Sequence, residues 1–266
     1  MEADAVRIAA SKLYRGEMDF AIAGGTGTVG GAVVAAAQRR GHATRVIARG
    51  HGVDVRTGVG LEGVLRGADA VIDVLNVQTS SARRAGEFFR STSGRLLEAE
   101  QRAGVPHHLV LSIVGVDRAP HGYYGAKLHQ ERAVADGSVP WTIQRVTQFH
   151  DFAAQMFAQT GIGPVHPAVR MRTQPVDVSE VAERLISLAE QPAQGRARDL
   201  AGPEEEDLAE MMRAWARHTG RRAWMPRIAL PGAFGRALRD GSMLPGPDAD
   251  RATGTFAGWL ERQRQA

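Results

Sequence analysis

The chain has 266 residues, 43% of them hydrophobic and 23% charged, which is the composition of an ordinary soluble globular protein. This length can bury one large core, or a core with a smaller lobe beside it. The sequence contains no cysteine, which excludes disulfides, thiolate catalysis and cysteine-ligated metal sites.

The net charge of +4 comes almost entirely from arginine, because Lys12 and Lys127 are the only lysines. The arginines are spread along the chain and form no basic run interleaved with aromatics, so we expect no nucleic-acid partner. No apolar run approaches the roughly 18 residues of a membrane span, and no membrane partner is expected. Acidic residues at Glu2 and Asp4 argue against a secretory signal, and we expect a cytoplasmic protein.

Residues 1–17 form an N-terminal extension ahead of the first predicted strand. Apolar side chains recur there at roughly helical spacing: Val6, Ile8, Ala9, Ala10, Leu13 and Tyr14. Two interpretations stay open, a frayed leader before Met18 and a docked helix or dimer arm. A homodimer is therefore a possible assembly.

Residues 20–37 carry the strongest indication of the fold. An apolar run, 20–23, ends in glycines, and an Ala/Val-rich helical run follows them at once. This order predicts strand, tight turn and helix, the opening of a dinucleotide-binding sheet whose helix N-terminus receives the phosphates. Two glycine patterns fit, one beginning at Gly25 and one at Gly24. The expected cofactor contacts in this stretch are Gly24, Thr26, Gly27, Thr28, Val29 and Gly30.

The second predicted strand, 42–48, ends at Arg49, where an NAD-preferring enzyme commonly carries Asp or Glu. A guanidinium can bind a 2′-phosphate that a carboxylate would repel, so the position favours NADPH over NADH. The alternative is a solvated loop arginine. A short third strand is predicted at 53–55, with Asp54 and Val55 placed to touch adenine.

Strand-like and helix-like segments continue to alternate along the chain, which predicts a doubly wound parallel sheet with helices on both faces. The expected elements are helix 61–65, strand 70–75, helix 86–104, strand 108–114, helix 127–135 and strand 141–146. Asn76 follows one strand at the carboxyl end, where such sheets bind ligands, and we expect it to contact the cofactor.

Beyond residue 150 the pattern changes, and we expect residues 18–150 to form the nucleotide-binding domain and 151–266 a smaller lobe, with parts returning to the sheet. Helices are predicted at 180–188, from Pro203 to His218, and in the tail around Phe234 and Trp259; a strand is predicted at 198–201. The candidate substrate-pocket residues are Phe149, His150, Phe152 and Met156. His150 is alternatively a hydrogen-bonded structural histidine, and the aromatic residues are alternatively core. His107 and His108 lack a nearby carboxylate pair, and we predict no metal site.

Tyr123 and Lys127 lie four residues apart at a helix start, which places them on one face. A nearby ammonium favours phenolate and is expected to lower the pKa of Tyr123. The tyrosine would then donate a proton to a carbonyl oxygen, with Ser112 bonding the same oxygen and Lys127 also holding the ribose. Each role has an alternative. Tyr123 could serve only to pack against or cover the nicotinamide, with Tyr124 as the functional phenol. Lys127 could bind only the ribose, and Ser112 could be a structural hydroxyl at the strand end.

Together these segments resemble the atypical short-chain dehydrogenase/reductases, and more narrowly the NmrA-like/isoflavone-reductase-like NAD(P)H-binding branch, over residues 18–205. The matching stretches are 24–30, Arg49, 111–115, 123–127, 140–143 and 174–178. The resemblance implies a Rossmann fold, NADP(H) and a C-terminal substrate lobe. That branch contains reductases and also non-catalytic redox sensors, which commonly lack the tyrosine. The loop between Ser112 and Tyr123 is shorter than in most classical members.

The function predicted from the sequence is NADPH-dependent reduction of a carbonyl or conjugated double bond in an apolar small molecule, with Tyr123 as proton donor. The first alternative is a non-catalytic NADP(H) sensor that couples cofactor occupancy to a protein partner. The second is an epimerase or dehydratase that uses bound cofactor without net consumption.

Overall fold

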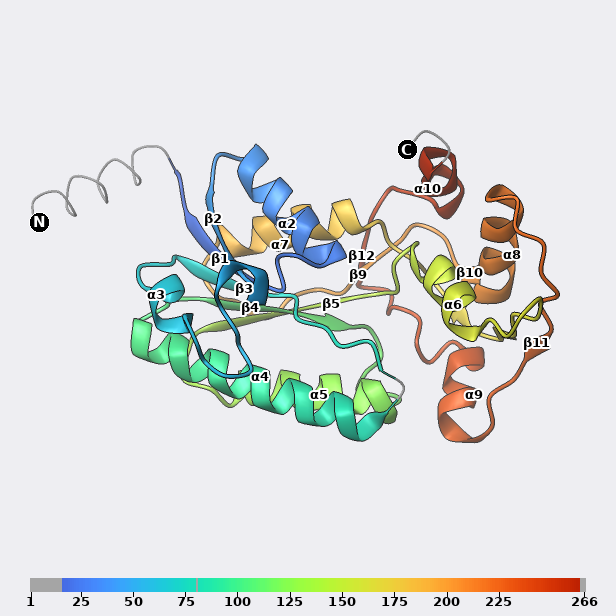
Figure 1. Cartoon of the computed structure of the whole chain (residues 1–266), viewed down its shortest axis with the longest axis horizontal. Helices are drawn as coiled ribbons and strands as arrows, with labels where there is room; N and C mark the ends of the chain where they lie inside the picture. Colours follow the sequence, from blue (N-terminus) through green and yellow to red (C-terminus); the bar gives the residue numbers. More distant parts are fainter. Residues whose placement is uncertain (1–15, 80, 264–266) are drawn as a thin grey trace, which may run out of the picture.

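The computed structural model describes residues 16–79 and 81–263. The helix expected within residues 1–17 falls almost entirely on residues 1–15, which lie outside the described ranges. In the described chain one parallel sheet of eight strands has the order β12-β9-β5-β4-β3-β1-β2, with β8 also paired to β5 (Figure 1). This arrangement confirms the predicted Rossmann-type α/β class.

The five longer strands come from the first 146 residues: β1 (Asp19–Ala23), β2 (Ala43–Ile47), β3 (Ala70–Asp73), β4 (His108–Ile113) and β5 (Trp141–Val146). Three short strands from the second half extend the sheet: β8 (Gly195–Arg196), β9 (Leu200–Ala201) and β12 (Asp250–Arg251). Every residue of β1 is buried, because a central parallel strand is covered on both faces.

Helices cover both faces of the sheet (Figure 1). One face carries α2 (Thr28–Arg39) and α7 (Val178–Ala189), which pack on alternate residues of β1, Phe20 and Ile22. The other carries α3 (Leu61–Leu65), α4 (Ala82–Ala103) and α5 (Gly122–Ala135). None of the helices in the described part of the chain has the length and apolar character that a membrane crossing needs.

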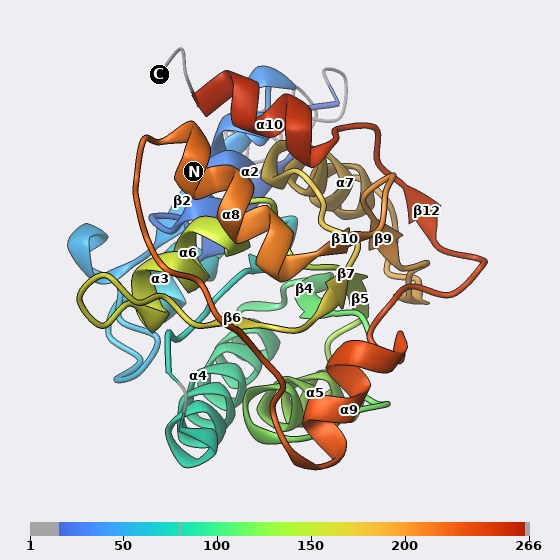
Figure 2. The same ribbon diagram turned by 90° about the vertical axis from the view of Figure 1, so that its right-hand side faces the viewer.

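The remaining elements surround a separate apolar cluster at one end of the sheet (Figure 2). Its helices are α6 (Phe152–Thr160), α8 (Leu208–His218), α9 (Gly232–Asp240) and α10 (Phe256–Gln263). Short strand pairs connect them: β6 (Ala168–Val169) with β11 (Arg227–Ile228), and β7 (Arg172–Thr173) with β10 (Glu206–Asp207). Phe157, Met212 and Leu238 are buried members of this cluster, from three of the helices.

Three predicted elements differ from the structure. The helix expected over 127–135 begins earlier, at Gly122, because His121 is its N-cap. Residues 53–55 form no strand, since Asp54 makes only an isolated antiparallel bridge with Val59. Glycines with positive φ, among them Gly52 and Gly58, turn the chain where an extended strand would continue. The helix expected from Pro203 begins at Leu208, because the Asp207 side chain caps it by accepting from the Ala209 and Glu210 N–H groups.

The loop between β1 and α2 packs closely against the first turn of α2, where Gly24 and Gly30 approach each other. A Cβ on Gly30 would lie 2.1 Å from the carbonyl oxygen of Gly24, well inside contact distance. That oxygen also accepts the N–H of Gly27 at 2.9 Å. The turn that opens the candidate site therefore exists only without a side chain at position 30.

We predict that Gly30→Ala destabilises the fold by about 3 kcal/mol, because its methyl group meets backbone that cannot move freely. Gly31→Ala is the matched control: it lies one residue on in the same helix, and its Cβ would come no closer than 4.0 Å to the Gly25 oxygen. Alanine there should add about 0.5–1 kcal/mol to stability. Denaturant unfolding of both variants measures this, and equal stabilities would contradict the close approach.

Candidate functional site

The glycine loop lies where the strand order reverses. β1 is flanked by β2 and β3, so the chain crosses from one side of β1 to the other between them. Gly24 donates its N–H to the Ile47 oxygen at 3.1 Å, and a Cβ on Gly24 would lie 3.2 Å from the Val74 oxygen. The loop thus lies between the carboxyl ends of β2 and β3, the usual ligand position in open α/β sheets.

The N-terminus of α2 is shaped to receive an anion. Its N-cap is Gly27, and no side chain caps the helix. The first N–H groups of a helix have no acceptor within it, and they carry the positive end of the helix dipole. Thr26, Gly27 and Thr28 are all exposed, whereas Val29 is half-buried against the core. These features fit a pyrophosphate bound at the backbone.

Arg49 lies directly beyond β2, in the 3-10 helix η1 (Arg49–His51). It is exposed, and no hydrogen bond or ion pair to another described residue holds its guanidinium. The nearby Asp54 carboxylate does not pair with Arg49; it accepts the Arg56 N–H at 2.8 Å. Val55 is buried, in a core that also contains Leu61. Arg49 therefore remains available to an anion beside the glycine loop.

Tyr123 meets the loop that follows β3. Its hydroxyl donates to Asn76 Oδ1 at 2.7 Å, and that oxygen also accepts the Val77 N–H at 2.6 Å. The ring packs edge-on against Phe89, with 5.7 Å between centroids. Burial, reinforced by Tyr124, raises the pKa of Tyr123. The expected lowering of this pKa is therefore wrong for the structure, because burial raises it and the Lys127 ammonium donates to other groups.

Lys127 lies one turn further along α5 and points inward. It is 5% exposed, and its Nζ donates to the Leu111 oxygen at 2.7 Å and to Gln130 Oε1 at 2.6 Å. Within the described residues it makes no hydrogen bond to Tyr123. Burial lowers the pKa of Lys127 to about 8, although Asp73 and Glu131 oppose the shift. The ammonium is therefore charged at neutral pH and close to its titration range.

Ser112 lies near the carboxyl end of β4 and is 1% exposed. Its hydroxyl has no hydrogen-bond partner among the described residues. Buried polar groups nearly always have a partner in a protein or its ligands. This unsatisfied hydroxyl therefore leaves open both interpretations of Ser112, the assisting residue and the structural one.

Tyr124 faces the C-terminal lobe. Its hydroxyl accepts from Gln148 Nε2 at 3.2 Å, and Gln148 Oε1 accepts from Thr173 Oγ1 at 2.7 Å. Its ring packs against the lobe's apolar cluster, as do Phe152 and Met156 of α6. Two of the four candidate pocket residues thus pack against the same apolar cluster as the second phenol.

The other two candidates lie elsewhere. Phe149 packs against the core beneath α2 and α7 and bridges to Val176. His150 is buried under α10, where its Nε2 lies 3.1 Å from the Gly254 oxygen. The centroid of its ring is 5.9 Å from that of Phe256. Its surroundings are those of a hydrogen-bonded structural histidine.

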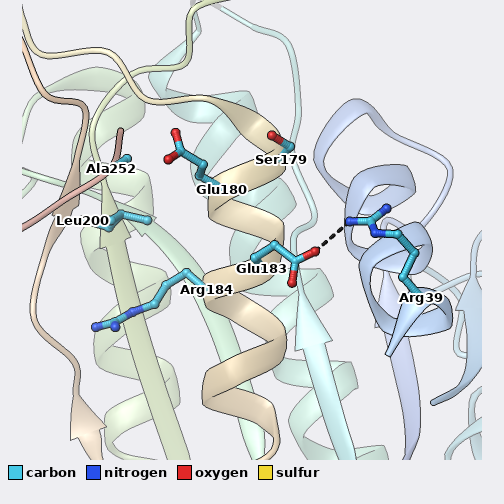
Figure 3. A pocket seen from close by; sticks show the side chains of 7 residues that line it. All are labelled: Arg39, Ser179, Glu180, Glu183, Arg184, Leu200 and Ala252. Carbon is cyan, nitrogen blue, oxygen red and sulfur yellow. Dashed lines mark hydrogen bonds and ion pairs between the residues drawn. The ribbon is translucent and has the colours of Figure 1, made fainter. Parts of the chain in front are cut away.

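A surface hollow of about 440 Å³ lies away from this crevice, over α7 and the end of β9 (Figure 3). Its charged groups already have partners. Glu183 pairs with Arg39 at 2.7 Å, and Arg184 pairs with Asp250 at 2.9 Å. Glu180 accepts the Gly254 N–H at 3.0 Å. The hollow therefore offers a ligand no free charge.

Sequence reasoning missed the residues that surround Lys127. Gln130 lies three positions further on the same helix face, and Asp73 interrupts an otherwise apolar strand. Because buried polar side chains need hydrogen-bond partners, the two polar residues could have been expected to contact each other. Gln130 Nε2 donates to Asp73 Oδ2 at 2.9 Å.

No protein-family model matches the sequence, and no curated protein is significantly similar to it. Solved structures do share its fold. A short-chain dehydrogenase/reductase superfamily protein from Agrobacterium tumefaciens with bound NAD is 20% identical, with 93% of this chain and 98% of that chain covered and a TM-score of 0.64.

Two further structures align at similar length. The NADPH-dependent quinone oxidoreductase QOR2 from Escherichia coli, complexed with NADPH, is 15% identical, with 92% and 99% covered and a TM-score of 0.66. The Citrobacter sp. triphenylmethane reductase complexed with NADP(H) is 14% identical, with 86% and 93% covered and a TM-score of 0.59. The chain therefore has the Rossmann fold found in these NAD(P)-binding proteins.

The buried ammonium predicts a pH dependence of stability. The pKa of Lys127 is about 8 in the fold, against an ordinary value of 10.5, so between these values the unfolded chain binds more protons. Stability therefore rises with pH across this window. Relative to Lys127→Met, the wild-type free energy of unfolding should increase by about 2 kcal/mol between pH 7 and pH 10. Denaturant unfolding at both pH values measures it, and a constant difference would contradict the burial of a charged amine.

Proposed function

We propose that the chain is an NADPH-dependent oxidoreductase that reduces a carbonyl or conjugated double bond of an apolar small molecule. One observation carries the proposal: the start of α2, which no side chain caps, Arg49, which pairs with no other described residue, and the Tyr123–Lys127 helix all lie at the same carboxyl edge of the sheet. The solved structures with this fold include complexes with NAD and with NADPH, which supports a nicotinamide dinucleotide.

The chain's own residues fit such a cofactor. The backbone around Gly24 and Gly27 would hold the pyrophosphate, and Arg49 would hold a 2′-phosphate. Asp54 and Val55 would lie toward the adenine, and Asn76 and Lys127 toward the nicotinamide half. When bound, NADPH supplies a hydride.

Tyr123 is the proposed proton donor. Its raised pKa keeps the phenol protonated at neutral pH, as a general acid must be. A substrate oxygen would replace Asn76 Oδ1 as the acceptor of that proton. The charge of Lys127 on the same helix face then stabilises the phenolate that remains. Ser112 assists at the same oxygen, and Phe152 and Met156 contribute the apolar wall.

A second candidate function is a non-catalytic NADP(H) sensor, and specific contacts favour it. The Tyr123 hydroxyl donates its hydrogen bond to Asn76, while Lys127 donates to Leu111 and Gln130 rather than to the phenol. A tyrosine whose pKa is raised is also a weaker proton donor. The two functions share the cofactor site and differ only in turnover.

Cofactor choice tests the phosphate assignment. We expect Arg49→Ala to weaken NADPH binding about 10–100-fold, because charge-assisted hydrogen bonds contribute about 1.5–3 kcal/mol. NADH binding should change little. Arg66→Ala is the control, since Arg66 is an exposed arginine paired with Glu62 on α3. Calorimetric titration gives the affinities, and equal wild-type affinities for NADH and NADPH would refute the role of Arg49.

Turnover tests the proton donor. Tyr123→Phe should lower kcat about 10²–10⁴-fold while NADPH affinity stays within twofold, because the phenol acts in the chemical step. Tyr124→Phe, the adjacent phenol, should alter KM more than kcat. NADPH oxidation is followed with quinones, enones and aromatic ketones. If wild-type protein binds NADPH but oxidises it with none of them, the sensor function is the correct one.

A further inference from the structure

Three buried polar side chains lie behind Lys127 and take no part in the proposed reaction. Gln130 accepts from the lysine at 2.6 Å through Oε1. Its Nε2 donates to Asp73 Oδ2 at 2.9 Å and to Ser93 Oγ at 3.0 Å. Gln130 is 2% exposed, Asp73 1% and Ser93 0%. The group joins α5, β3 and α4 beneath the candidate site.

The chemistry of the two neighbours fixes the orientation of the Gln130 amide. An ammonium can only donate hydrogen bonds and a carboxylate can only accept them. The amide oxygen must therefore face Lys127 and the amide nitrogen must face Asp73, since the opposite orientation would make both contacts repulsive. Asp73 is held in turn, because its Oδ1 accepts the Leu75 N–H at 2.9 Å.

We propose that Gln130 is a positioning residue that fixes the Lys127 ammonium against the Leu111 carbonyl and keeps it from direct contact with Asp73. An amide suits this place because it is uncharged and has a donor and an acceptor at opposite ends. Without it, the ammonium would lose one of the two acceptors that the described residues give it. The inference rests on the proposed function in one respect, that Lys127 belongs to the site.

The charged groups near Lys127 are few in the described structure. Asp73 on β3 and Glu131 on α5 both favour the charged amine. Glu131 is bound by the Arg145 guanidinium of β5 at 2.6 and 2.7 Å. The ring of Phe89 on α4 lies 4.8 Å from Nζ. The hydrogen bond that Lys127 donates to Gln130 adds a direct contact to the support that these two carboxylates give the charge.

The experiment reads Lys127 directly. Because the chain has only two lysines, Lys12→Arg leaves one, and protein labelled with ¹³Cε-lysine gives a single side-chain signal to titrate by NMR. In that background Gln130→Met should raise the acid dissociation constant of Lys127 about tenfold, since a hydrogen bond to a charged group is lost. Gln144→Met removes another buried glutamine, on β5, and should leave the constant unchanged.

A conservative replacement provides the rescue. Gln130→Glu again offers Lys127 an acceptor oxygen, so the dissociation constant should return to the wild-type value or fall below it. This variant also carries the test if Gln130→Met does not fold. A dissociation constant that is unchanged or lower in Gln130→Met, or raised in Gln130→Glu, would overturn the proposal.

The titration needs neither cofactor nor substrate, so it separates this inference from the proposed function. A protein that oxidises no NADPH can still show the tenfold change. If turnover is observed, the basic limb of the pH profile of kcat should move by the same factor in Gln130→Met. If the role of Gln130 is purely structural, Gln130→Met will lower the stability of the protein but change neither the dissociation constant of Lys127 nor the pH profile of kcat.

Discussion

The structure around the candidate site depends on one buried ammonium. Lys127 joins α5 to β4 through the Leu111 carbonyl, and no carboxylate among the described residues contacts it directly. Burying an ionised amine costs several kcal/mol unless hydrogen bonds replace its water. A methionine of similar length would fill the space at lower cost. Stability alone therefore does not explain a lysine at this position.

The same contact sets the directions of the two phenols. Successive residues of a helix project about 100° apart, so fixing α5 at Lys127 sends Tyr123 and Tyr124 to different sides. Tyr123 meets Asn76, after β3, and Tyr124 meets Gln148, after β5. One phenol thus lies on the crevice side and the other at the apolar lobe. The two neighbouring phenols therefore face different parts of the structure, the loop after β3 and the C-terminal lobe.

The regular part of the fold was readable from the sequence because local signals agree there. The apolar run, glycines and helix at 20–37 each favour the same turn, and every long strand appeared near its predicted bounds. The strand at 53–55 failed because alternating valines outweighed the flanking glycines in the prediction. The contacts of Tyr123 with Asn76 and of Lys127 with Gln130 were not readable as pairs. They depend on the packing of α5 on the sheet, which spacing along one helix does not determine.

The missing strand bears on cofactor choice. Among the described strands β2 lies at the edge of the sheet, and the chain leaves it through η1 and a glycine-containing loop. Val53 and Val55 bury their side chains in the core beside α3, which anchors this loop from below. The Asp54 carboxylate is turned toward the Arg56 N–H. The loop is therefore held in place by its valines, while Arg49 is exposed and has no partner among the described residues, as the proposed contact with a 2′-phosphate requires.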